Sequence, residues 1–259
     1  MPSLAPENIA SLRVLNQEII GCFRCPRLVA HREEVARVQR RAYRGQQYWG
    51  RPVPGFGDPG ARVLIIGLAP GAHGANRTGR MFTGDQSGEF LFRALWEAGF
   101  ANKPQSISRD DDLLLTDAYI TATVRCAPPD NKPARDEILN CRPFLVRELE
   151  LLKNVEVIVT LGGIALNAYL SVLQDRELIK SRAQYRFAHG AEYRTHEGRP
   201  LVLASYHPSQ QNTSTKLLTR DMLRDVFLRA RRLVAGSKAP VTSTPRAASR
   251  VGRSERPAG

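Results

Sequence analysis

Three polar loops and four cysteines are the parts of this 259-residue chain whose residue types could do chemistry. The longest loop, residues 67–85, is rich in glycine, which lets a backbone approach a ligand closely. It is not a P-loop, since no Gly-Lys-Ser/Thr follows, and it lacks the GxGxxG of a dinucleotide fingerprint. Loops of this length inside compact domains are usually functional, so we expect this one to contact a ligand.

Two shorter loops carry further polar groups. Residues 125–133 read RCAPPDNKP, in which the double proline fixes the chain and Asn131 can both donate and accept hydrogen bonds. Residues 206–216 read YHPSQQNTSTK, and His207 comes where an apolar run ends, so its ring can face a ligand crevice. A hydroxyl within residues 213–215 could cap the helix that follows. Ordinary turn chemistry and a structural histidine are the alternatives.

The four cysteines form one short pair and two distant single residues. Cys22 and Cys25 are a CxxC, whereas Cys126 and Cys141 lie about one hundred residues later. Two thiolates at CxxC spacing can share one metal ion or one corner of a cluster. Four thiolates suit either Zn²⁺ or an iron–sulfur cluster, and their spacing does not decide between these. Four buried free thiols are the alternative.

The patterns of apolar residues predict the elements that position these loops. Four short apolar runs predict strands at Val63–Gly67, Ala118–Arg125, Val155–Gly162 and Leu201–Tyr206. Helical patterns separate or precede them, at Glu7–Ile20, Leu28–Arg40, Glu89–Ala98, Arg135–Lys153, Ile164–Leu170 and Lys216–Leu233. Near-continuous apolar strands alternating with helices predict an α/β, three-layer sandwich with a central four-stranded parallel sheet. Ligands of such sheets bind at the carboxyl ends of the strands, where the loops above begin.

The remaining segments set the limits of the domain. Tyr185–Thr195 predicts a hairpin around His189-Gly190. Residues 236–259 are rich in Ser, Pro, Ala and Arg with few large apolar residues, which predicts a disordered basic tail. We therefore expect one folded domain over residues 1–235.

The net charge favours a polyanionic partner. Lysine and arginine total 38 against 25 acidic residues, a formal charge of +13, with basic excess in Arg27–Arg44 and in the tail. Such a surface attracts nucleic acid first and anionic membrane second, although no strongly apolar face accompanies the basic stretch. We find no signal peptide and no apolar run long enough to cross a membrane, so we expect a cytoplasmic protein.

Taken together, the loops resemble the type-5 (family 5) branch of the uracil-DNA glycosylase superfamily. The resemblance rests on GLAPGAHGANRTGRMFTGDQSG, VRCAPPDNKP and HPSQQN, and on the arrangement of the four cysteines. It implies a four-stranded parallel sheet between helices, in agreement with the pattern above. It also implies a [4Fe-4S] cluster, with a structural role, on Cys22, Cys25, Cys126 and Cys141; zinc is the alternative.

The reaction that the resemblance implies is hydrolysis of the N-glycosidic bond of a deaminated base in DNA, which leaves an abasic site and begins base excision repair. The nucleotide must first be flipped into a pocket. His207 would donate a hydrogen bond to the base oxygen that gains charge, and Phe82 matches the aromatic residue that stacks on the base. The resemblance extends the pocket to Gly67, Ala69, Ala122 and Asn212, and it makes Gln210 and Gln211 candidate wedge residues.

The chain also departs from other branches of that superfamily. Leu68 and Ala69 are apolar where related branches place the polar residue that holds the attacking water, and Ala122 stands where another branch has Asn. The resemblance therefore points to Asn131 as water ligand. Asp85 would be a second polar group, or merely the cap of the next helix. A pocket without a polar discriminator predicts broad specificity, with uracil foremost and also hypoxanthine, xanthine and 5-hydroxymethyluracil.

Two other functions remain open from the sequence. A non-catalytic, metal-cluster nucleic-acid-binding protein would explain the charge and the cysteines, but not the convergence of polar loops. A small-molecule enzyme could use the glycine-rich loop for a nucleotide. We expect a monomeric glycosylase acting on damaged, uracil-containing DNA.

Overall fold

The computed structural model describes residues 6–195 and 200–236 and builds them around one six-stranded sheet. The strand order is β1-β3-β2-β4-β6-β5. The inner four strands are parallel, and they are β2 (Val63–Gly67), β3 (Ala118–Ala122), β4 (Val157–Leu161) and β6 (Leu201–Ser205). Every residue of β2, β3 and β4 is buried, as their apolar runs predict. The predicted four-stranded parallel sheet is confirmed.

Two short antiparallel strands extend this sheet at its edges. β1 (Phe56–Gly57) pairs with β3, and β5 (Glu192–Arg194) pairs with β6. The predicted hairpin around His189-Gly190 is wrong. The N–H of Gly190 donates to the carbonyl of Ala204 in β6 at 2.8 Å, so the backbone pairs with the open edge of β6. Tyr185 folds back onto Tyr193 only through its side chain, with the ring centroids 5.6 Å apart.

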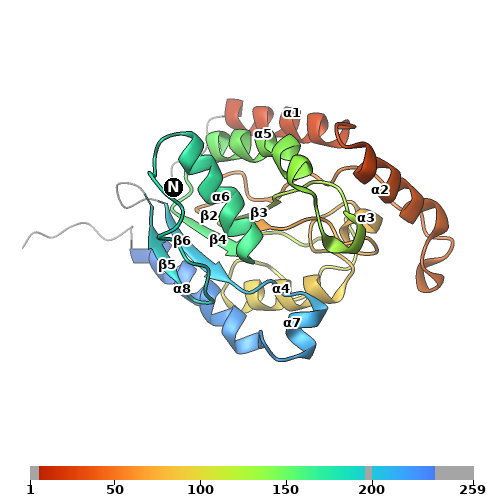
Figure 1. Cartoon of the computed structure of the whole chain (residues 1–259). Helices are drawn as coiled ribbons and strands as arrows, with labels where there is room; N and C mark the ends of the chain where they lie inside the picture. Colours follow the sequence, from red (N-terminus) through yellow and green to blue (C-terminus); the bar gives the residue numbers. More distant parts are fainter. Residues whose placement is uncertain (1–5, 196–199, 237–259) are drawn as a thin grey trace, which may run out of the picture.

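Helices cover both faces of the sheet and complete the three layers (Figure 1). Helices α4 (Gln86–Glu97) and α8 (Arg220–Gly236) pack on one face, where Val63 and Ile65 point. Helices α5 (Arg135–Leu151) and α6 (Gly163–Asp175) pack on the other face, where Leu64 and Ile66 point. Helix α1 (Pro6–Ile20) lies along α5, with Leu15 and Ile19 against Phe144.

The remaining helices are short or lie near the cysteines: α2 (Pro26–Val38), η1 (Arg41–Tyr43), α3 (Ala75–Thr78), η2 (Pro129–Asn131) and α7 (Gln210–Ser214). The helix predicted over Lys216–Leu233 begins instead at Arg220, and the polar run before it forms α7. Ser209 caps α7 by accepting from the N–H of Asn212, and Thr219 accepts from the N–H of Met222. The cap predicted within residues 213–215 is therefore wrong, because the polar run itself is helical.

The ends of the domain are described only in part. Gly236, the first residue of the predicted tail, ends α8, and residues 237–259 lie outside the described residues. No helix within residues 6–195 and 200–236 combines the length and the apolar character needed to cross a bilayer.

The strand order places a binding crevice at one point of the sheet. From β2 the chain continues to β3 on one side and then to β4 on the other side, so the order reverses between β2 and β4. Ligands of open α/β sheets bind outside the carboxyl ends of the strands at such a point. Gly67 ends β2 and Gly162 follows β4, so both belong to this crevice.

Candidate active site

An aromatic pair, Phe82 and His207, occupies the crevice between β2 and β4. The ring centroids are 5.7 Å apart with the planes tilted by 33°. A Cβ atom at Gly67 would lie 2.9 Å from two ring carbons of Phe82, so only glycine lets the ring lie over the end of β2. A Cβ atom at Gly162 would lie 3.5 Å from that of His207. Three of the predicted site residues, Gly67, Phe82 and His207, are therefore brought together.

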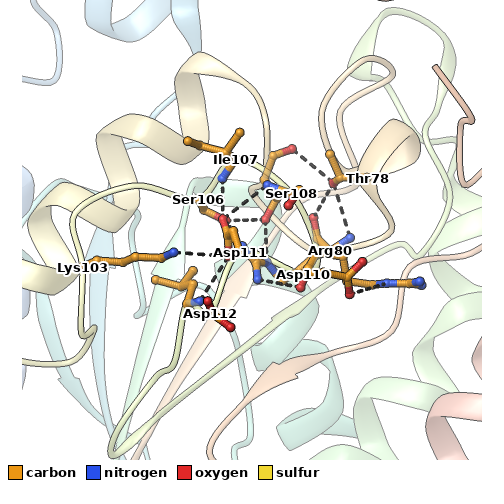
Figure 2. A network of polar contacts seen from close by, with 12 residues as sticks. Thr78, Arg80, Lys103, Ser106, Ile107, Ser108, Asp110, Asp111 and Asp112 are labelled. Atoms are coloured by element: carbon orange, nitrogen blue, oxygen red, sulfur yellow. Dashed lines mark hydrogen bonds and ion pairs between the residues drawn. The ribbon is translucent and has the colours of Figure 1, made fainter. Parts of the chain in front are cut away.

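Residues that flank Phe82 in the sequence belong to a buried polar network that holds this segment in place; Figure 2 shows the network. Its backbone has φ of +52°, an uncommon conformation for a phenylalanine that the surroundings must support. Arg80 is 3% exposed and donates to the hydroxyl of Thr83 at 3.0 Å, to that of Ser106 at 2.6 Å and to Asp111 at 2.7 Å. Because Arg80 and Thr83 flank the segment, their partners fix its backbone.

Asp111 is the anionic end of this network. It also accepts hydrogen bonds from the backbone N–H groups of Ile107 and Leu113, at 2.7 and 3.1 Å. Burial opposes its ionisation, but these bonds and the guanidinium of Arg80 prevail and lower the pKa of Asp111 to about 2. The network is therefore ionised at neutral pH.

His207 is enclosed, and that sets its protonation. Burial lowers the pKa of His207 to about 4, so its ring is neutral at pH 7. A neutral imidazole still offers one N–H donor. The side-chain amide of Asn212 on α7 donates to the carbonyl of His207 at 2.9 Å, so this predicted site residue fixes the backbone of the histidine.

Asp85 caps a helix and also faces the glycine-rich loop. One carboxylate oxygen accepts from the N–H of Gly88 at 2.9 Å, which caps α4. The other lies against Gly74, where a Cβ atom would come within 1.8 Å of it. Burial raises the pKa of Asp85, against the opposing effects of the Gly88 N–H and of the Arg77 charge. Both roles predicted for Asp85 are thus compatible with its position.

The remaining predicted site residues lie in different places. Ala122 is buried at the end of β3 and is in register with Gly67. Asn131 lies on η2 after β3, with an exposed side chain and φ of +56°. Ala69 packs against the cysteines instead of the Phe82–His207 pair. The two wedge candidates, Gln210 and Gln211, are exposed on α7.

The four cysteines line one cavity between the N-terminal helices, the β3–α5 loop and α5. Cys25, Cys126 and Cys141 are buried and Cys22 is partly exposed, all as free thiols. Burial raises the pKa of Cys126 to about 11 and that of Cys141 to about 12. Within the described ranges, no group of three or more His, Cys, Asp or Glu side chains is arranged to hold a single metal ion. The four thiols therefore share one cavity.

Two buried arginines flank this cavity and test which group would fit it. Arg32 is fully buried and donates to the sulfur of Cys126 at 3.1 Å, while its Nε has no hydrogen-bond partner within the described residues. Among the residues that the structure describes, its one ion pair is with the half-exposed Glu33, at 3.7 Å. Arg125 pairs with the buried Glu148, but its Nε and Nη1 lack partners in that same part of the chain.

These buried hydrogen-bond donors without partners indicate that an anionic group would fit the cavity. A buried cation without compensation costs several kcal/mol, and buried donors without partners call for an explanation. Thiolate ligands around an iron–sulfur group would supply negative charge beside both guanidinium groups. The residues present thus fit an anionic, thiolate-bound group.

Sequence reasoning missed the residues that support the site from behind. Arg80 and Asp111 looked like loop residues, because no local pattern links positions so far apart. His189, expected in a hairpin turn, stacks on Tyr206 at 5.3 Å, and its Nδ1 accepts from the N–H of Tyr206 at 3.3 Å. This holds the residue before His207.

Comparison with known proteins places this architecture in a family. The model of the uracil DNA glycosylase superfamily matches residues 54–231. A type-5 uracil-DNA glycosylase of Thermus thermophilus is 54% identical over 217 residues, which cover 84% of this chain and 95% of that protein. The corresponding protein of Mycobacterium leprae is 49% identical over 224 residues, 86% of this chain and 96% of the relative. A type-4 enzyme of Sulfurisphaera tokodaii is 26% identical over 231 residues, 88% of this chain and 87% of the relative.

The fold and the crevice between β2 and β4 are thus those of a glycosylase, an enzyme that hydrolyses N-glycosyl bonds. The chain belongs to the uracil-DNA glycosylase superfamily, and within it to the type-5 branch.

Proposed function

We propose that this protein removes uracil and other deaminated bases from DNA by hydrolysing the N-glycosidic bond, leaving an abasic site for base excision repair. The observation that carries the proposal is the enclosed pair of Phe82 and His207 at the switch point of the sheet. An aromatic face beside a hydrogen-bond donor suits a flat base that gains negative charge as it leaves. The net charge of +13 suits a polyanionic substrate.

The reaction needs a flipped nucleotide, because the bond cannot be reached inside a stacked duplex. Phe82 would stack on the extruded base. His207 would donate its N–H to the base oxygen on which charge develops as the bond to the sugar breaks. Because the ring is neutral and already desolvated, this donation needs no prior proton uptake, and one such donor contributes roughly 3–4 kcal/mol.

Water then adds to the sugar carbon that the base has left, and the proton that this water loses neutralises the departed base anion. We assign its orientation to Asn131 with Asp85 as a second group. Asn131 is neutral and can orient water but not deprotonate it strongly, whereas Asp85 turns one oxygen towards the glycine-rich loop. Orientation alone can accelerate a reaction by a large factor when the leaving group is already stabilised.

We further propose broad specificity, extending to hypoxanthine, xanthine and 5-hydroxymethyluracil. The wall of the crevice at Ala122 is apolar and buried, so it offers no polar group that the wrong base would leave unpaired. Selectivity would then depend on shape and on the His207 contact.

The cysteines would hold a [4Fe-4S] cluster with a structural role, zinc being the alternative. Cys22, Cys25, Cys126 and Cys141 are the ligands that we assign, and the unanswered donors of Arg32 and Arg125 support an anionic group there. A cluster binds each thiolate at a separate corner, so it suits thiols spread around a cavity. When bound, it would supply a covalent link between the N-terminal helices and the sheet. We expect iron in the purified protein, and a zinc-containing colourless protein would contradict the cluster but not the glycosylase.

The decisive experiment incubates the protein with duplexes that each carry one uracil, hypoxanthine, xanthine or 5-hydroxymethyluracil. Alkaline treatment then breaks the strand wherever a base has been lost. We expect cleavage of each duplex, fastest with uracil, and almost none with His207→Ala. Tight binding of the uracil duplex without base release would instead favour a non-catalytic DNA-binding protein. We expect the protein to act in the cytoplasm. We also expect it to be a monomer, which sedimentation of the purified protein would check.

A further inference from the structure

A second concave surface is lined by Arg77 and Thr78 of the glycine-rich loop and by neither Phe82 nor His207. It is a cavity of about 570 Å³, formed by residues 46–51, by α3 and by residues 108–110. That size falls within the range of about 300–1,000 Å³ typical of ligand sites. Three guanidinium groups line it, those of Arg51, Arg77 and Arg109, together with the indole of Trp49. We call it the arginine–tryptophan pocket.

The positive charge of this pocket is largely uncompensated. Arg77 donates to the carbonyls of His73 and Gly84, each at 2.8 Å, and to the side chain of Gln46 at 2.9 Å, so none of its partners is a carboxylate. Arg51 makes no ion pair within the described residues. Arg109 has only the highly exposed Asp110, at 3.8 Å. The nearby His73 reflects the same field, since its pKa is lowered by burial and by the charges of Arg40 and Arg77.

Contacts within the chain hold the walls of the pocket in place. The guanidinium carbons of Arg109 and Arg51 lie 4.9 and 5.9 Å from the centre of the Trp49 ring. The indole N–H donates to the carbonyl of Pro52 at 3.1 Å. Arg80 donates to the carbonyl of Arg109 at 3.1 Å, so the network that supports Phe82 also fixes this wall (Figure 2). Groups held in advance lose less entropy on binding a ligand.

We propose that the arginine–tryptophan pocket binds the sugar–phosphate backbone of the DNA strand next to the flipped nucleotide. Phosphate oxygens match the guanidinium groups, and the indole provides a stacking surface for a sugar or an unstacked base. Arg77 links this pocket to the candidate active site, because its guanidinium reaches Gly84 beside Asp85. The inference rests on the proposed action on DNA.

The test measures how affinity depends on salt, using a duplex whose uridine carries a 2′-fluorine that blocks hydrolysis. Each phosphate contact contributes about 0.9 to the slope of log K against log salt concentration. We expect Arg51→Gln and Arg109→Gln each to lower that slope by about 1 and the double variant by about 2. Arg13→Gln on α1 removes the same charge from an exposed position outside the pocket and should bind DNA like the parent. Equal slopes for all the variants would overturn the proposal.

Tryptophan fluorescence gives a second readout. The chain has two tryptophans, so Trp96→Phe on α4 leaves Trp49 as the sole emitter. We expect the emission of this variant to be quenched as DNA binds, and unchanged emission on bound DNA would contradict the pocket. Base release is measured separately. If the parent bound DNA without releasing uracil, the proposed function would fail while the salt slopes still decided whether the pocket binds the strand.

Discussion

The Phe82–His207 site and the cysteine cavity both join segments that are far apart in the sequence, but they satisfy their polar groups differently. Around Phe82, Arg80 finds its partners within the chain, in Thr83, Ser106 and Asp111. Around the cysteines, Arg32 and Arg125 leave donors without partners in the described residues.

The first region pairs the donors of its buried arginine within the chain, whereas the second leaves buried donors without partners in the described residues. The polypeptide alone can organise the crevice for its substrate, because Phe82 and His207 are each oriented by hydrogen bonds within the chain. The cysteine cavity concentrates positive charge and protonated thiols, and the proposed cluster would supply the negative charge that its buried donors lack. Substitutions in the two regions should therefore respond differently to removal of a metal centre.

The largest expected effect is the change in the free energy of unfolding on substituting Arg32. The sign of this change should depend on whether the cysteine cavity holds iron. In iron-loaded protein, Arg32→Met removes a cation that faces an anionic group, and we expect the free energy of unfolding to fall by about 3–5 kcal/mol. In protein stripped of iron, the same change removes a buried charge whose ion pair with the half-exposed Glu33 is long, at 3.7 Å, so stability should stay equal or rise. Urea unfolding of both forms, with the iron content measured, checks this.

The matched control is Arg37→Met, in an exposed arginine of the same helix that does not line the cysteine cavity. It should change the stability of both forms only slightly. Equal destabilisation by Arg32→Met in loaded and stripped protein would show that Arg32 stabilises the fold by packing alone, and the contrast between the two regions would be lost.

The next largest effect is expected at His207. His207→Ala removes the donor for the departing base, and loss of one such donor costs about 10²–10³-fold in rate. The measurement is uracil release from a duplex under single-turnover conditions at saturating enzyme. Because the crevice is complete without the metal centre, the iron content of the variant should equal that of the parent. A rate within twofold of the parent would remove His207 from the proposed chemistry.

Asp85 offers a sharper comparison within the crevice. Asparagine is also a good helix cap, so Asp85→Asn should keep the thermal midpoint near that of the parent while losing the carboxylate. Asp85→Ala should also lose about 1 kcal/mol of stability with the cap. If Asp85 orients water, both variants slow base release similarly. If only Asp85→Ala slows it, capping is the whole role of Asp85.

The sequence predicted the strands and their end loops well, because apolar runs and turn residues are local signals. Val63–Gly67 matches β2 to the residue, and His207 follows β6 as expected. Residues whose role depends on tertiary contacts could not be predicted from the sequence. Arg80 meets Asp111 only once residues 106–111 fold over the glycine-rich loop.

The errors of prediction have the same physical origin. The edge of β6 captures Glu192–Arg194, so a segment that looked like a self-contained hairpin pairs elsewhere. The polar run after His207 looked like a loop, yet Ser209 caps it into α7. The prediction for Ala69 illustrates the same limit. Its place in the glycine-rich loop was evident, but not that its side chain would pack against the cysteines.

The smallest expected effect is on the thermal midpoint in acid. It should distinguish His207 from the Arg80–Asp111 network by the pH range in which each changes stability. Burial lowers the pKa of His207 to about 4 in the folded state, so the neutral ring adds no charge penalty above about pH 6.5, but it destabilises the fold increasingly as the pH falls from 6.5 towards 4 and the unfolded chain takes up the proton. Asp111, with a pKa of about 2, keeps its contribution above about pH 4 and loses it as the pH falls through 2. Across pH 2–8, the thermal midpoint of His207→Asn should therefore rise relative to that of the parent as the pH falls from about 6.5 to 4, whereas that of Asp111→Asn should converge on the parent as the pH falls from about 4 to 2. If both differences changed within the same pH window, the histidine and the Arg80–Asp111 network would titrate as a single unit.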